Sequence, residues 1–208
     1  MTDSLEDLGT IDVMTWVWNW SPVPRVEFLF SRTLRDFGST AQEVVSETDY
    51  NPFQGQYEFL ISDKETEYDF LEFFLGKRGR TQKFWCKSPH QTFTLKSNVG
   101  AGSSLLYVED NRADYIWQGH ERIWIKLANG DEITRQVSNV VRDTDLDRIE
   151  LHLETLITTG FDIEDVVFFG RIYLVRCDLD KYQVSYESDK VCTVTIKVYE
   201  TVREYDDI

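Results

Sequence analysis

Residues 191–202 read Val-Cys-Thr-Val-Thr-Ile-Lys-Val-Tyr-Glu-Thr-Val, a run in which apolar and polar side chains alternate. Because successive side chains of a β-strand point to opposite faces of a sheet, this alternation predicts a strand with one buried face. Further strand-like stretches occupy residues 25–30, 54–62, 83–87, 165–176 and 182–187. The chain is therefore expected to be mainly β.

Two interruptions in these patterns predict turns. Residues 32–50 carry β-branched residues on both sides of Gly38-Ser39, which favours a hairpin. In residues 165–176, Gly170-Arg171 separates two apolar runs and is expected to divide two strands.

One helix is predicted at Lys64–Lys77. Ser62 or Asp63 can cap its first turn, and Gly76 or Gly79 is expected to stop it. Acidic residues near its start and basic residues near its end suit the helix dipole. The apolar residues expected to share its buried face are Tyr68, Leu71, Phe74 and Leu75.

A change in composition predicts an inserted domain. From residue 94 to residue 162, short β-like pieces are punctuated by glycine, and Asn129-Gly130 is a strong hairpin signal. Regularly spaced short strands favour a small antiparallel β-barrel. We therefore expect a flexible acidic arm at 1–13, a parent β-sandwich or split barrel with one packed helix at 14–93 plus 163–208, and an inserted barrel at 94–162. A tandem of two domains is the weaker alternative.

The charge balance argues against specific nucleic-acid binding. The 208-residue chain has 37 acidic and 22 basic residues and a net charge of −15, whereas binding to phosphates needs Lys and Arg. An acidic surface favours solubility, and the wall of a channel that repels DNA is the functional alternative. With no long apolar run and no basic, apolar leader, a soluble protein without a membrane segment is expected.

The motifs of common enzymes are absent from the sequence, so no catalytic residue, metal or cofactor is predicted and the protein is expected not to be an enzyme. Cys86, Cys177 and Cys192 are widely spaced and suit buried thiols in a reducing compartment. Alternate carboxylates at Asp143–Asp147 superficially suggest calcium. However, the segment lacks the glycine and distal glutamate of an EF-hand loop, and a solvated turn is the better interpretation.

Aromatic and basic clusters supply the candidate interaction residues. Trp16, Trp18 and Trp20, at a spacing of two, form either the core face of an edge strand or an anchor onto a neighbouring subunit. The two roles are compatible. The basic segment 76–80 is interpreted mainly as a helix end and turn, and secondarily as an interface through Lys77, Arg78 and Arg80. Trp117 and Trp124 are candidates for a ligand platform, although Trp124 alternates with isoleucines and also suits the core.

The segment Leu71–Arg80, Leu-Glu-Phe-Phe-Leu-Gly-Lys-Arg-Gly-Arg, is followed closely by Phe84-Trp85. This pattern resembles a motif of minor tail proteins in long-tailed bacteriophages and gene transfer agents, where an acidic helix precedes an aromatic pair. The tryptophan-rich opening at 16–23 is similar to the start of related phage proteins, but it lacks their first proline. The strand at 170–175 and the ending at Tyr199-Glu200 are also similar. The resemblance covers residues 14–93 and 163–202.

The resemblance implies a distal tail protein in the virion, made in the cytoplasm of the host bacterium. It implies a ring of about six copies (a hexamer) that joins the tail tube to the baseplate and hub. The expected partners are other copies of the chain and the tail tube, hub and tape-measure proteins, with DNA passing through the lumen without specific binding. The alternative function is a carbohydrate- or receptor-binding module of a viral tail.

Overall fold

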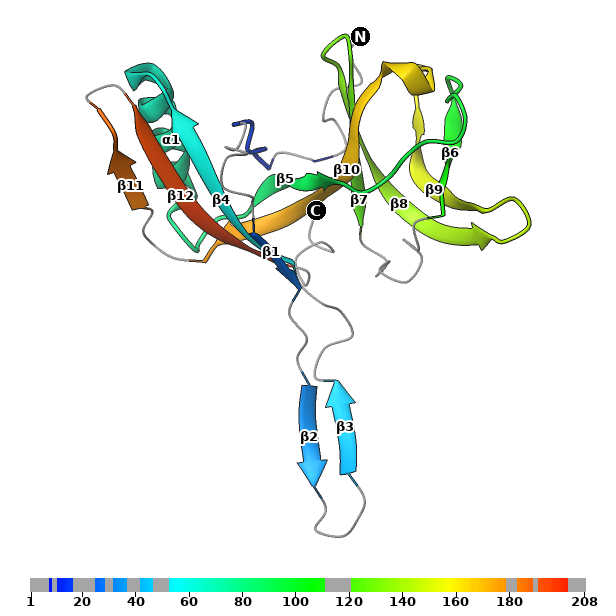
Figure 1. The fold of residues 1–208 in the computed structure, drawn as a ribbon, viewed down its shortest axis with the longest axis horizontal. Coiled ribbons are helices and arrows are strands. Elements are labelled where there is room, and N and C mark those ends of the chain that lie inside the picture. Colours follow the sequence, from blue (N-terminus) through cyan, green and yellow to red (C-terminus); the bar gives the residue numbers. More distant parts are fainter. Residues whose placement is uncertain are drawn as a thin grey trace. The chain divides into compact units, whose positions relative to one another are not determined.

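The protein is mainly β with one α-helix, which confirms the predicted fold class (Figure 1). The computed structural model describes residues 8, 11–16, 25–28, 32–36, 42–46, 53–110, 121–178, 183–188 and 191–201. The description that follows is confined to these residues.

The chain divides into two compact units. The barrel unit contains Trp85–Tyr173 and the described residues up to Met14, and the helix unit contains the described residues of Thr15–Phe84 and Leu174–Glu204. These units change over at 84/85 and 173/174, whereas the domain boundaries expected from composition lie at 93/94 and 162/163. Residues 85–93 and 163–173, which lie outside the expected insertion, belong to the same compact unit as residues 94–162, a feature that composition does not reveal.

The barrel unit is built from consecutive antiparallel strands. They are β6 (Ser103–Glu109), β7 (Arg122–Leu127), β8 (Glu132–Asp143), β9 (Arg148–Ile157) and the first part of β10 (Val166–Cys177), with the short helix η3 (Ile163–Asp165) before β10. Their order is β10-β7-β8-β9-β6. The turn predicted at Asn129-Gly130 joins β7 to β8, and Gly130 has a φ of 91°.

The segment after β5 (Phe84–Gln91) closes these strands into a barrel. The amide of Phe93 donates to the carbonyl of Phe169 on β10 at 3.2 Å, and the amide of Glu109 on β6 donates to the carbonyl of Thr94 at 2.9 Å. The first and last strands of the series are therefore joined through residues 93 and 94, and Figure 1 shows the strands curling around one interior. The interior holds one apolar cluster, comprising Phe93, Leu95, Val99, Leu106, Val108, Ile123, Ile125, Leu127, Ile133, Val137, Ile149, Leu151, Leu153, Ile157, Phe161 and Phe169.

Strand β7 is buried on both of its faces. Ile123 and Ile125 belong to the barrel interior, and β5 covers the opposite face. There the guanidinium of Arg122 lies 5.3 Å from the ring centre of Trp85, and the ammonium of Lys87 lies 4.5 Å from that of Trp124. The indole nitrogen of Trp85 donates to the carbonyl of Leu8 at 3.1 Å, which ties Leu8 to this layer.

The helix unit contains a sheet covered by one helix. Its strands are β1 (Arg25–Phe28), β4 (Phe53–Ile61), β12 (Cys192–Glu200), β11 (Gln183–Tyr186) and the last residues of β10. Strand β4 lies between β1 and β12, and β12 also pairs with β11 and β10. Odd-numbered residues of β4 are buried, whereas Gln54, Gln56, Glu58 and Leu60 lie on the outer face with greater exposure.

Helix α1 spans Lys64–Lys77, as predicted, but its predicted buried face is only partly correct. Phe70, Phe74 and Lys77 are buried, whereas Tyr68 and Leu75 are 66% and 62% exposed. The burial of Phe74 confirms one predicted residue. Tyr68 and Leu75 were placed wrongly because the aromatic residues that contact the sheet set the orientation, with Phe70 packing 5.4 Å from Phe59. Asp63 caps the start, and the helix ends at Arg78, whose left-handed φ is 50°.

The division expected at Gly170-Arg171 is also wrong, because β10 is one continuous strand. A Cβ atom at residue 170 would lie 2.9 Å from the carbonyl oxygen of His90 and 2.6 Å from the ring of Phe168. Glycine there permits close packing rather than a turn. The hairpin expected in residues 32–50 is confirmed: β2 (Arg32–Asp36) pairs antiparallel with β3 (Gln42–Ser46).

Candidate functional site

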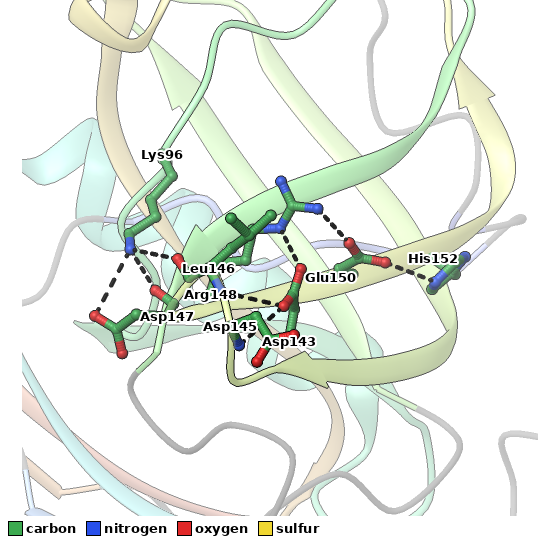
Figure 2. A network of polar contacts seen from close by, with 8 residues as sticks. All are labelled: Lys96, Asp143, Asp145, Leu146, Asp147, Arg148, Glu150 and His152. Carbon is green, nitrogen blue, oxygen red and sulfur yellow. Dashed lines mark hydrogen bonds and ion pairs between the residues drawn. The ribbon is translucent and has the colours of Figure 1, made fainter.

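The turn between β8 and β9 carries the network of polar contacts drawn in Figure 2. One carboxylate oxygen of Asp143 accepts the amides of Asp145 and Leu146 at 3.2 and 3.1 Å. Its other oxygen lies 3.2 Å from Arg148, which also contacts Glu150 at 2.8 Å. Glu150 in turn lies 3.8 Å from His152. Ion pairs and backbone hydrogen bonds therefore hold this turn from within.

The same network explains why the Asp143–Asp147 pattern is a turn. Lys96 donates to the carbonyl of Asp147 and lies 3.8 Å from its carboxylate. Lys96 and Arg148 thus lie beside the carboxylates, where a bound metal cation would otherwise lie. Among the described residues, no group of three or more His, Cys, Asp or Glu side chains is placed to hold a metal ion.

A cavity of about 140 Å³ lies in the barrel unit near the β7–β8 turn. Leu127, Ile133 and Phe161 form its apolar part and are buried. Asn129 and Asp131 at its rim bond to each other, with the Asn129 amide donating to Asp131 at 2.8 Å. The polar side chains of this turn therefore bond to one another, and the apolar residues lie beneath them. Asp165 and Thr159 complete its polar lining.

Trp124 does not fit the ligand platform predicted for it. The residue is 6% exposed, its ring packs 4.8 Å from Phe168, and the Lys87 ammonium lies over it. Lys87 is fixed there by a 2.6 Å ion pair with Glu132. A sugar needs an open ring face, and this indole has none; its core role, the alternative left open, is the one observed. Trp117 lies outside the described residues.

Of the tryptophan stripe, only Trp16 lies within the described residues; Trp18 and Trp20 lie outside them. The Trp16 ring packs edge-on against Phe70 and Phe73 of α1, at 5.1 Å from each ring. Trp16 is half-buried. It therefore contributes to the helix unit's own packing, and the anchor role of the stripe stays a prediction.

The three basic candidates at the end of α1 differ in availability. Lys77 is 4% exposed and its ammonium lies 5.1 Å from the Phe73 ring centre. It is therefore not exposed on a surface that another protein could contact. Arg78 is exposed. Arg80 is exposed as well, with a long 4.0 Å contact to Asp178, and its carbonyl accepts from Arg176 at 3.1 Å. An interface through Arg78 and Arg80 stays a prediction.

Shifted pKa values cluster at the start of α1. Hydrogen bonds from the amide and hydroxyl of Thr66 lower the pKa of Asp63. The hydrogen bond from Lys64 lowers the pKa of Glu67, and the 2.6 Å bond that Tyr186 donates to Glu67 raises the pKa of the phenol. Asp63 and Tyr186 are exposed and Glu67 is half-buried, and their hydrogen bonds stabilise the start of the helix.

Burial raises the pKa of the Cys192 thiol. All three cysteines are buried and none is in a disulfide, which agrees with their predicted role as small apolar residues.

A second cavity, of about 130 Å³, lies on the outer face of the helix unit's sheet. It is lined by Arg25, Gln54, Gly55, Gln56 and Lys197. Sequence reasoning missed this group because its members come from three strands that are distant along the chain. Only the register, in which Gln56 lies opposite both Arg25 and Lys197, brings them together.

Unpaired strand edges are the other candidate interaction surfaces. Within the described chain, β2 and β3 pair only with each other, and β1 pairs only with β4. Free strand edges present backbone donors and acceptors to any strand that approaches them. No helix in the described residues is long and apolar enough to span a membrane.

The fold and these sites together define a mainly β protein with two compact units and with strand edges that no other described strand covers. No protein-family model matches the chain, and a search of curated proteins finds no significant match to it.

Proposed function

We propose that the protein is a structural subunit of a phage tail tip, a distal tail protein that forms a ring between the tail tube and the baseplate or hub. The observation that carries the proposal is the β2–β3 hairpin, whose strands pair with no other strand of the described chain. The resemblance of residues 71–85 to minor tail proteins supports the same assignment.

The physical argument concerns the stability of such a hairpin. A two-stranded sheet is marginally stable in water unless further strands or a packed surface support it. Each strand here has five residues. Pairing with an identical neighbour would supply the missing strands and, repeated around a closed ring, would satisfy every copy equally.

The charge of the chain suits a DNA channel. A net charge of −15 opposes binding to phosphates. DNA passing through a lumen formed by such subunits would slide without specific contacts. The other tail proteins above and below the ring are the expected partners.

Light scattering behind a sizing column tests the proposal by giving the mass in solution. We expect a discrete ring of about six subunits. Val44→Pro removes a backbone donor from β3, so this variant should run as a folded monomer. Val44→Thr keeps the donor and the strand preference, and should still assemble.

Circular dichroism and melting of the two variants control for folding. A wild-type chain that stays monomeric, or a Val44→Pro variant that assembles as well as wild type, would count against a ring built through the hairpin.

A further inference from the structure

The cavity on the outer face of the helix unit's sheet gathers donors from three adjacent strands. Arg25 on β1 lies opposite Gln56 on β4, and Lys197 on β12 lies opposite Gln56 on the other side. Residues directly opposite one another in a sheet share a face. Adjacent strands are about 4.8 Å apart, so the backbones of Arg25 and Lys197 lie about 10 Å apart. Both long side chains can therefore reach one ligand bound between them.

Each of the four polar side chains that line the cavity can donate hydrogen bonds. Arg offers a planar fork of N–H groups, Lys an ammonium, and Gln54 and Gln56 each an amide NH₂. Among the described side chains, no carboxylate lines it. Within the described part of the chain, neither Arg25 nor Lys197 forms an ion pair. In a protein with a net charge of −15, two neighbouring cations that form no ion pair with a described carboxylate are available to an anionic ligand.

We propose that this cavity is an oxyanion-binding site, which takes a carboxylate or phosphate group between Arg25 and Lys197. Charge-assisted hydrogen bonds from the guanidinium and the ammonium hold the oxygens. The amides of Gln54 and Gln56 donate to those that remain. At about 130 Å³ the cavity has room for such a group with some of its hydration.

Two sources could supply this chemistry: the carboxylate of a protein side chain, and free phosphate. Acetate and inorganic phosphate stand for them as probes. Titration of each into the full-length protein at low ionic strength, followed by NMR, should shift the Gln54, Gly55 and Gln56 amides in a saturable way. Tighter binding of acetate would identify a carboxylate source, and tighter binding of phosphate a phosphate source.

Three variants make the test specific. Arg25→Gln/Lys197→Gln removes both charges and should weaken binding by about tenfold or more. Lys126→Gln makes the same kind of charge change on β7 in the barrel unit and should leave binding unchanged. Glu58 lies next to Gln56 on the outer face of β4, so Glu58→Gln removes a nearby negative charge and should strengthen binding.

The spectra of the variants also report whether each is folded. If the double variant does not fold, the gain in Glu58→Gln remains a test of the same site. The proposal is overturned if neither anion gives saturable shifts at residues 54–56, or if the folded double variant binds as wild type does. It is also overturned if Glu58→Gln binds no tighter.

Discussion

Gly55 shows how strongly one residue can be fixed by its neighbours. It lies in the middle of β4, where its buried side faces the rings of Phe53 and Tyr57. A Cβ atom at this position would lie 2.8 Å from the Phe53 ring and 2.7 Å from the Tyr57 ring. Both rings are themselves almost fully buried, at 1% and 0% exposure. Neither can move aside without disturbing the core, because protein interiors are closely packed.

Gly55→Ala should therefore destabilise the protein by about 1–3 kcal/mol, the usual cost of overpacking. Chemical denaturation measures the change. Gly76→Ala is the matched control, since a Cβ there meets nothing within 4 Å. That variant lies within α1 and should gain about 0.5–1 kcal/mol from improved helix propensity. Equal effects of the two substitutions would contradict the packing explanation.

The start of α1 depends on a charged cap. The Asp63 carboxylate accepts the Thr66 amide at 2.8 Å and the Thr66 hydroxyl at 2.9 Å, and these bonds lower its pKa. A group whose pKa is lower in the folded state adds stability above its unfolded pKa. That stability is lost as pH falls through the folded pKa. The relevant window therefore lies below about pH 4.

The melting temperature of wild type should fall more steeply in that window than that of Asp63→Asn. The asparagine oxygen accepts the same amide at every pH, so its cap does not titrate. Other carboxylates titrate in both proteins, and the difference between the two pH profiles isolates Asp63. Parallel profiles from pH 6 to pH 3 would show that the cap makes no charge-dependent contribution.

At the scale of helices, strands and turns, the local sequence made some features predictable. The bounds of α1 follow from an acidic cap and a basic end, and the β7–β8 turn follows from Asn129-Gly130. The buried face of α1 was only partly predictable: Phe74 was expected there, whereas the burial of Phe70 depends on a sheet formed from distant strands. The strand division at Gly170 was predicted wrongly for a similar reason. The backbone that this glycine accommodates belongs to β5, eighty residues earlier. The Arg25–Gln56–Lys197 row likewise exists only through strand register.

At the scale of the whole molecule, the barrel unit has its own core. Every residue of that core lies between Phe93 and Phe169, and the closing hydrogen bonds join residues within the same span. The helix unit differs, because its β4 needs β12, which comes after the barrel in the chain. One unit is thus almost continuous in sequence and the other is not.

A fragment of residues 85–173 should therefore fold by itself, whereas a fragment of residues 15–84 should not. Dispersed amide resonances and a cooperative melt would mark the folded fragment. The second fragment serves as the control, since it retains β1, β4 and α1 but lacks β12. A disordered 85–173 fragment would show that the barrel requires the rest of the chain.

The late position of β12 also sets an order of events during synthesis. As the chain leaves the ribosome, the barrel's residues are complete about thirty residues before β12 is. Until β12 arrives, β4 lacks the strand that pairs with it along most of its length. A nascent chain would thus carry a finished barrel and an unfinished sheet. If the proposed ring forms through the helix unit, translation itself would delay assembly until each chain was complete.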